Sequence, residues 1–198
     1  MKFRGLKEVL KAAASAAAVL IASGMVKDQA FARGTYTIEC IGADGQVKWR
    51  DVAKNTVMTA GKNLALDTIL AGSAYTVTGP YMGLISSSSY SAISAADTMS
   101  SHAGWLEAGN ANAPTYSGSR KTAAFSSASS GSKALSSALS YSITGTGTIK
   151  GCFIVFGPSA SATVDNTSGT LLSAGLFSGG DRAVINGDTV NVSYSLAL

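Results

Sequence analysis

The sequence predicts a mainly β protein, in which an antiparallel β-sandwich or jelly-roll-like domain with one short helix follows an N-terminal helical extension. Short segments of alternating apolar and polar residues recur through most of the chain, as in half-buried strands. Turns rich in Gly, Ser and Asn separate these segments. The N-terminal segment is instead rich in Ala, with apolar residues at helical spacing. We therefore expect two parts, a helical segment over residues 1–32 and the β-domain over residues 33–198.

The first element of the β-domain is predicted to be a hairpin over residues 36–57. Apolar and polar residues alternate on both sides of a short turn that contains Asp44 and Gly45, which is a strong local signal for a β-hairpin. Glu39 would then meet a basic residue of the second strand on the solvent side. The apolar side chains that we expect to face the core are Tyr36, Ile38, Cys40, Val47 and Trp49.

The remainder of the domain is predicted to contain one helix and several strands. Residues 62–71 carry Leu66, Ile69 and Leu70 at helical spacing and precede Gly72, which favours a short helix that ends there. The most apolar run, over residues 148–156, is predicted to be a central strand that is buried on both faces. The other predicted strands span residues 75–85, 121–127, 135–143, 170–177, 181–185 and 189–198.

The N-terminal segment over residues 1–32 has two interpretations. Its basic start, its short apolar run and the Ala-Phe-Ala sequence at residues 30–32 are typical of a cleaved secretory signal peptide. Its apolar stripe is also typical of an amphipathic helix that stays in the mature protein, and we favour this interpretation. The apolar run is too short to span a membrane, so no membrane partner is expected. The candidate protein-interaction residues of this helix are Leu6, Val9, Leu10, Leu20 and Ile21.

The composition predicts an ordered protein with few charges. Hydrophobic residues make up 46% of the chain and are sufficient for a core, whereas only 13% of the residues are charged, about half of the usual share. A weakly charged surface favours packing against neighbours in an assembly. The net charge is +4, but 5 of the 15 basic residues lie in the N-terminal segment. Since no basic run with interleaved aromatic residues follows Gly34, we expect no nucleic-acid partner.

Candidate catalytic groups are few. His102, the only histidine, has Asp97, Ser100 and Ser101 nearby in the sequence, but the members of a catalytic triad normally come from distant segments. We expect His102 to be a loop residue that packs beside Trp105. The carboxylates are spread over separate loops, so no acid–base pair is indicated. We therefore predict a protein that is not an enzyme.

Cofactor and metal sites are not indicated either. Cys40 and Cys152 lie in apolar strand-like sequence and are interpreted as buried thiols, although a disulfide is the alternative. Two cysteines without clustered histidines do not form a zinc site. Asp165-Asn166 and the Gly-Gly-Asp sequence that ends at Asp181 are possible calcium loops, but turn formation explains these residue types as well.

A family resemblance is spread over five separated segments between Arg33 and Leu198. The segments that carry it are RGTYTIECIGADGQVKWRD with the following NTV and GKNLALDTILAG, then YTVTGPYMGLI, DTMSSHAGWLE, ITGTGTIKGCFIVFG and GDTVNVSYSLAL. They resemble a group of tailed-bacteriophage virion proteins of the head decoration (capsid cement) or tail-fibre-like type. This resemblance implies a β-sandwich without enzymatic activity that sits on the capsid in many copies, often as trimers. Residues 1–32 lie outside the resemblance.

Three functions follow as hypotheses. The first is a capsid decoration protein that binds the major capsid protein and itself, as a homotrimer or another homo-oligomer. It would be assembled in the host cytoplasm on the capsid surface of the virion, with residues 1–32 as the anchor. The second is a tail, neck or fibre component, such as a receptor-binding module. The third is a secreted bacterial adhesin or carbohydrate-binding domain, whose mature chain would begin at Arg33 after signal-peptide cleavage.

Overall fold

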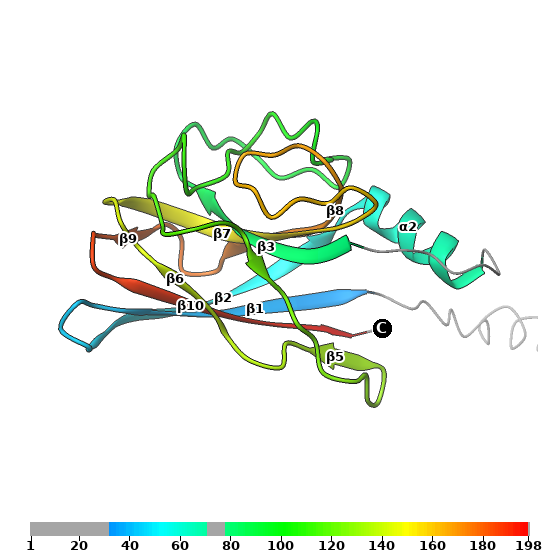
Figure 1. The fold of residues 1–198 in the computed structure, drawn as a ribbon, viewed down its shortest axis with the longest axis horizontal. Coiled ribbons are helices and arrows are strands. Elements are labelled where there is room, and N and C mark those ends of the chain that lie inside the picture. The colour runs from blue at the N-terminus through cyan, green and yellow to red at the C-terminus, as the bar shows by residue number, and fades with distance from the viewer. Residues whose placement is uncertain (1–31, 71–77, 198) are drawn as a thin grey trace, which may run out of the picture. The chain divides into compact units, whose positions relative to one another are not determined.

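A computed structural model describes residues 32–70 and 78–197, and this part of the chain is mainly β, as predicted (Figure 1). The strands form one antiparallel sheet, and a single helix, α2, is described beside it. The elements are β1 (Arg33–Ile41), β2 (Val47–Val57), α2 (Thr59–Leu70), β3 (Thr78–Ser86), β4 (Lys121–Thr122), β5 (Ser132–Ala134), β6 (Leu139–Ser142), β7 (Gly147–Gly157), β8 (Thr170–Phe177), β9 (Arg182–Val184) and β10 (Thr189–Ala197).

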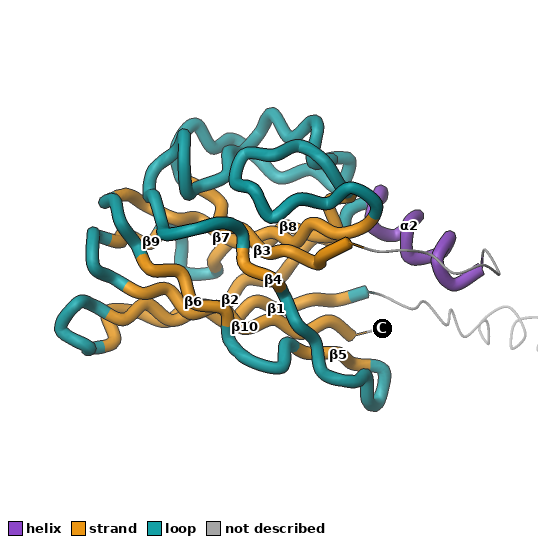
Figure 2. The backbone as a smooth tube through the Cα atoms, in the orientation of Figure 1, coloured by secondary structure: helices purple, strands orange, loops and turns teal. Residues whose placement is uncertain are grey.

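The sheet is continuous and curled into a half-barrel. Its strand order is β4-β3-β7-β8-β2-β1-β10-β5, with β6 also paired to β10 and β9 also paired to β7. The curl brings β3 and β7 over β1 and β10 (Figure 1), and the loops that follow β3 and β7 lie above the sheet (Figure 2). Right-handed strand twist favours this curling in an open antiparallel sheet of many strands.

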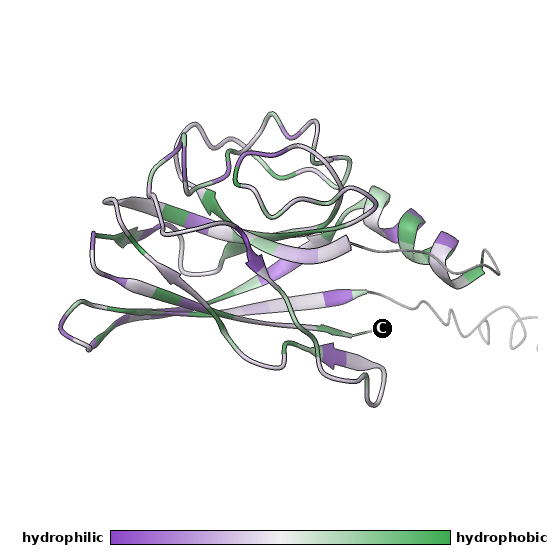
Figure 3. Cartoon of the chain, viewed as in Figure 1, coloured by the Kyte–Doolittle hydropathy of each residue, from purple (hydrophilic) through white to green (hydrophobic). Residues whose placement is uncertain are grey.

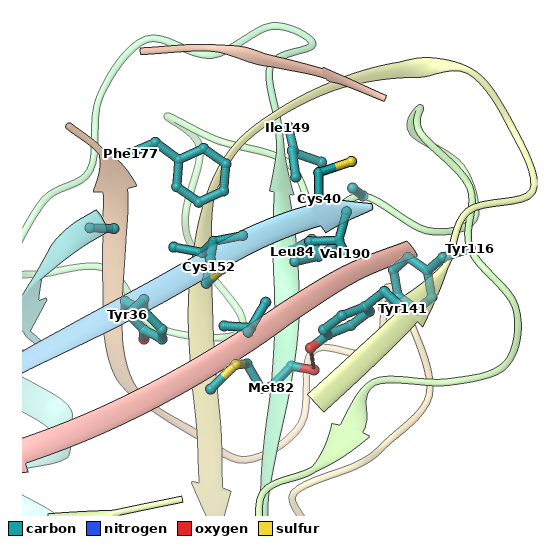
Figure 4. Close-up of a cluster of buried hydrophobic side chains, with 14 of the residues drawn as sticks. Tyr36, Cys40, Met82, Leu84, Tyr116, Tyr141, Ile149, Cys152, Phe177 and Val190 are labelled. Atoms are coloured by element: carbon teal, nitrogen blue, oxygen red, sulfur yellow. Dashed lines mark hydrogen bonds between the residues drawn. The ribbon is translucent and has the colours of Figure 1, made fainter. Parts of the chain in front are cut away.

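The main core lies inside the curl, between β1 and β10 on one side and β3 and β7 on the other (Figure 4). Its members include Cys40, Leu84, Cys152 and Val190, all fully buried. The hydroxyl of Tyr141 is also buried and donates to the carbonyl oxygen of Met82 at 2.8 Å, because a buried hydroxyl needs a partner. Each large apolar side chain buried here contributes about 1.5–3 kcal/mol. Both cysteines are free and buried, which confirms the interpretation as thiols.

A second core covers the opposite face of β7. Phe153 and Val155 of β7 pack there with Trp105 of the β3–β4 loop, whereas Cys152 and Ile154 point into the main core. The rings of Trp105 and Phe153 are 5.2 Å apart. The prediction that this run is a strand buried on both faces is therefore confirmed. The loop residues above the sheet are consequently packed, although they contain little regular secondary structure.

The first hairpin forms as predicted, with one exception. The three residues of β1 that were predicted to face the core, Tyr36, Ile38 and Cys40, are buried, and Glu39 pairs with Arg50 across the strands at 2.5 Å. Trp49 is partly buried, and its indole donates to the carbonyl oxygen of Ala183 at 3.1 Å. Val47 was expected in the core but is 42% exposed. A bulge after Cys40 causes this, because the register shift pairs Val47 directly with the outward-facing position 41.

The helix begins three residues earlier in the sequence than predicted. The face that it buries is not the one that carries the predicted apolar stripe. Leu66 and Leu70 are 55% and 76% exposed, whereas Leu64 is buried. Apolar residues occur along the whole of α2 (Figure 3), but only its first half packs on β8. There Gly61 approaches Leu172 so closely that a Cβ would lie 2.8 Å from the carbonyl oxygen. The predicted end of the helix, at residues 71 and 72, lies outside the described residues.

The remaining strands agree with the predictions to different degrees. Strands β7, β8, β9 and β10 lie at the predicted places, and β3 occupies the described part of residues 75–85. Of the predicted strand over residues 121–127, Lys121–Thr122 forms the strand β4, and Phe125 makes an isolated bridge to Leu135. The segment over residues 135–143 forms a strand only at Leu139–Ser142, preceded by the short β5. These short strands lie at the two ends of the sheet.

Candidate functional sites

The predicted anchor lies outside the described residues. Its candidate interaction residues, Leu6, Val9, Leu10, Leu20 and Ile21, all fall within residues 1–31. Their interaction with a partner stays a prediction. The described residues offer two other candidate sites, one on the outer face of the sheet and one among the loops above it.

The first site is the outer face of β10, β1 and β2, which we call the sheet face. The pairing registers place its side chains in three rows across the strands. These rows are Ser195–Thr35–Lys54, Ser193–Thr37–Val52 and Asn191–Glu39–Arg50. The single carboxylate and Arg50 neutralise each other, and the central row carries no charge. A depression of about 380 Å³ lies over the rows that contain Thr37 and Glu39, next to Ala138.

The second site surrounds His102, where the structure confirms the predicted packing. The imidazole of His102 stacks on Trp105 with ring centroids 4.0 Å apart, and its Nδ1 lies 3.0 Å from the Trp105 carbonyl oxygen. Asp97 instead accepts a bond from the Trp105 indole at 2.9 Å. The Asp97 carboxylate that suggested a triad therefore bonds to the tryptophan and not to the histidine, and the Ser100 hydroxyl pairs with that of Thr98.

A buried ion pair between Glu107 and Arg120 lies next to this loop. Arg120 donates to both carboxylate oxygens, at 2.8 and 2.6 Å, and its side chain is fully buried. It also donates to the carbonyl oxygens of Ser161 and Asn166, at 2.9 and 2.7 Å. The backbone N–H of Asp165 donates to the same carboxylate at 2.8 Å. The pair thus joins the β3–β4 loop to the β7–β8 loop. The planar guanidinium of arginine suits the bidentate contact with the carboxylate.

The electrostatics of this pair reflect its burial. Burial raises the pKa of Glu107, and the hydrogen bonds and charge of Arg120 oppose that rise. Burial also raises the pKa of Tyr116, and its hydroxyl, which is buried beside the pair, has no hydrogen-bond partner within the described residues. The carboxylate keeps its hydrogen bonds from two loops and so holds their backbones together.

Two adjoining hollows lie over the ion pair, and together we call them the loop hollow. They share His102, Leu106 and Thr167. The larger one, of about 320 Å³, extends along residues 99–106, and the smaller one, of about 120 Å³, reaches down to the ion pair. The other residues that line the smaller part are Asn112, Asp165 and Asn166. Hydrophilic, neutral and hydrophobic residues are interspersed along the loops above the sheet (Figure 3).

Two further buried carboxylates accept hydrogen bonds from neighbouring turns and stabilise them. Asp51 accepts bonds from Arg182 at 2.7 Å and from the backbone and hydroxyl of the turn after β8. Burial raises the pKa of Asp51, but Arg182 and the surrounding hydrogen bonds outweigh it and lower the pKa overall. Asp188 accepts from Lys48 at 2.5 Å and from the N–H of Ile185 at 2.9 Å. Both contacts tie β2 to the segments that flank β9.

The proposed calcium loops serve as turns in the structure. Asp165 accepts a bond from the N–H of Ala111 at 3.2 Å, and Asp181 bonds to Lys150. Within residues 32–70 and 78–197, no group of three or more His, Cys, Asp and Glu side chains could hold a metal ion. The described part of the chain also contains no helix that is long and apolar enough to cross a membrane.

Sequence reasoning missed the main residue of the loop hollow. Arg120 lies between Ser119 and Lys121 in the sequence, and nothing in its neighbourhood predicts that it pairs with Glu107. A scan against protein-family models finds no match to this chain, and searches of the curated proteins and of the solved structures find none either. The resemblance to phage virion proteins therefore stays a prediction.

Proposed function

We propose that this chain is a structural protein of a phage virion without enzymatic activity, and specifically a decoration protein of the capsid. In this proposal its partners are the major capsid protein and other copies of the same chain, as a homotrimer or another homo-oligomer. The sequence resemblance supports the class of protein. The structural observation that supports it is the sheet face, whose central row of Ser193, Thr37 and Val52 is uncharged and solvent-facing.

The sheet face suits association with another protein for two reasons. Serine, threonine and asparagine side chains are short, so fixing them in an interface loses less conformational entropy than fixing lysine or glutamate. Their hydroxyl and amide groups exchange bonds with water for bonds with a partner at little net change in free energy. Glu39 and Arg50 already neutralise each other at 2.5 Å, so burial of this part would not leave an unpaired charge.

We propose that the curled sheet is a jelly-roll-like sandwich, in which β3 and β7 form one layer and β1 and β10 form the other. The main core between these strands supports this assignment. A rigid two-layer domain keeps the sheet face in one shape, as a protein that is repeated many times on a lattice requires.

The location of the chain in the virion tests the proposal. An electron-microscopy reconstruction of the particle would show the described β-domain on the capsid surface, on the order of hundreds of copies, set by the symmetry of the head. Density at the tail or neck, with about six to a few tens of copies, would support the tail hypothesis instead. Absence from the particle, together with a mature chain that begins at Arg33, would support the secreted protein.

A variant pair tests the sheet face itself. Thr37→Asp places a charge at the centre of the face, where burial against a partner would desolvate it and weaken binding by several kcal/mol. Thr163→Asp adds the same charge on an exposed loop outside both sites and serves as the control. Occupancy on purified capsids should fall for Thr37→Asp alone. Equal occupancy of the two variants would exclude the sheet face as the contact surface.

A truncation tests the anchor separately. Removal of residues 1–32 should lower occupancy on capsids if the apolar stripe binds the major capsid protein, because each buried apolar side chain contributes about 1.5–3 kcal/mol before ordering losses. Size measurement by light scattering on the same protein shows whether the β-domain still self-associates. Unchanged occupancy after truncation would contradict the anchor.

A further inference from the structure

We infer that the loop hollow is a binding site for a neutral saccharide. The inference goes beyond the proposed structural role, because it concerns a small-molecule site on the loops and not the sheet face. It is based on the shape of the hollow, the charge of its lining and the hydrogen-bonding groups that remain available around it.

The floor of the hollow is rigid and electrically balanced. Glu107 and Arg120 cancel each other's charge, and Arg120 makes four hydrogen bonds to the two loops. A ligand therefore needs no charge of its own to satisfy this floor. Preorganised polar groups of this kind support binding, because they lose little entropy when a ligand arrives.

The rim of the hollow carries polar groups that could form further hydrogen bonds with a ligand. Nδ1 of His102 engages the carbonyl oxygen of Trp105, which leaves Nε2 of the ring. The amides of Asn112 and Asn166 each make one bond within the protein, although an amide has four bonding positions. Thr167 adds an exposed hydroxyl. Mixed donors and acceptors at short spacing match the hydroxyl groups of a sugar, which donate and accept at the same time.

An apolar surface lies beside these polar groups. Leu106 is half-buried at the junction of the two parts of the hollow, and the His102 ring is held flat by its stacking on Trp105, with an angle of 22° between the rings. A pyranose ring has a C–H face that packs on flat or apolar groups while its hydroxyls bond at the edge. The larger part, about 320 Å³, is within the range of roughly 300–1,000 Å³ for small-molecule sites.

The charge of the lining excludes the main competing ligand class. Once Glu107 and Arg120 cancel, Asp165 is the remaining charged group of the smaller part. A negative lining disfavours phosphates and carboxylates through like-charge repulsion. A cation would find only one carboxylate, and one of its oxygens already accepts from Ala111. Neutral polyols therefore fit the site better than ions of either sign.

Nuclear magnetic resonance of the full ¹⁵N-labelled chain tests the site directly. The probes are the methyl glycosides of glucose, galactose, mannose and N-acetylglucosamine, with inorganic phosphate as the charged comparison. At least one glycoside should shift the amide resonances of His102, Asn166 and Thr167 in a saturable way, with Kd on the order of millimolar. Shifts from phosphate alone, or no saturable shift with any glycoside up to about 50 mM, would overturn the inference.

A matched pair of variants adds a second criterion. Thr167→Val removes one hydroxyl with almost no change in shape and should weaken binding about fivefold, the effect of one hydrogen bond. Thr163→Val makes the same change on the same loop outside the hollow and should leave Kd unchanged. Equal affinity for both variants would contradict the site. Capsid occupancy of Thr167→Val should stay at the wild-type value, so the two proposals fail independently.

Discussion

The stability of the loops above the sheet is expected to depend on Arg120. In Arg120→Met the hydrophobic part of the side chain keeps its length, but the guanidinium that neutralises Glu107 is lost. The carboxylate then stays buried without a countercharge, which typically destabilises a protein by about 3–5 kcal/mol. The carbonyl oxygens of Ser161 and Asn166 also lose their donor, at roughly 1 kcal/mol each.

The expected effect is large enough to measure by thermal unfolding. For a chain of this size, each kcal/mol corresponds to about 2–4 °C in Tm, so the combined loss of about 5–7 kcal/mol in Arg120→Met should lower Tm by about 10–28 °C. Arg120→Lys keeps the charge without the two-pronged geometry and should fall between wild type and Arg120→Met. The double variant Glu107→Gln/Arg120→Met removes both charges and should recover part of the loss. A double variant less stable than Arg120→Met, or a single-variant loss below about 1 kcal/mol, would refute the reasoning.

The pH dependence of the same variant gives an independent check. Burial raises the pKa of Glu107 and Arg120 opposes the rise, so without the arginine the folded-state pKa lies further above the unfolded value of about 4.3. A carboxyl with a raised folded-state pKa favours folding when protonated, and this stabilisation is lost as the pH rises through the folded-state pKa. The stability deficit of Arg120→Met should therefore shrink between neutral pH and about pH 5. Urea titrations at both pH values measure it.

Three further predictions concern other buried groups. The pKa of Asp51 is lowered in the folded state, so the stability that this carboxylate contributes is lost as the pH falls below about 4. Asp51→Asn should therefore be less stable than wild type at neutral pH but lose less stability on acidification. Urea unfolding at both pH values would show this. Burial raises the pKa of Cys40 to about 12 and also raises that of Cys152, so an aromatic disulfide reagent should react with both thiols in denaturant and with neither in the folded protein. A Cβ at Gly151 would clash with the carbonyl oxygen of Gly175, so Gly151→Ala should lower stability by about 3 kcal/mol in thermal unfolding.

The strands that sequence alternation predicted well are those that are paired along most of their length and have one face in the core. In β10 the alternation of buried Val190 and Val192 with half-exposed residues is visible in the sequence itself. Alternation failed at Val47, because the bulge beside Cys40 changes which face the chain presents without changing the sequence pattern. It also failed at the sheet ends, where only short parts of long alternating segments find a neighbour.

Helix periodicity and loop packing show a second limit of the sequence. The stripe around Leu66 predicted a helix correctly but not its buried face, because only the first turns of α2 reach β8 at Leu172. The Glu107–Arg120 pair could not be predicted. Its partners are 13 residues apart in the sequence, and the carbonyl groups that complete it lie 41 and 46 residues from Arg120. Such contacts depend on tertiary structure and leave no periodic trace.

The internal use of charge also determines how binding should respond to salt. Several carboxylates are buried in the β-domain, where they form ion pairs, including Asp51, Glu107 and Asp188. Apart from Lys54 at the end of one row, the sheet face carries hydroxyl and amide groups, Val52 and one neutralised pair, so association through it should change little with ionic strength. The N-terminal segment, by contrast, contains five basic residues, and exposed charges are screened within about 10 Å at 0.1 M salt.

Capsid occupancy at two salt concentrations separates these contributions. Between about 50 and 500 mM salt the full chain should lose occupancy, because screening weakens the attraction of the basic segment to an acidic partner surface. The variant without residues 1–32 should start lower and stay constant over the same range. A truncated chain that is as salt-sensitive as the full chain would show that charges of the β-domain itself contact the partner. In that case Lys54, at the end of one row of the sheet face, would be the first residue to replace, because it is the charged side chain of that face outside the Glu39–Arg50 pair.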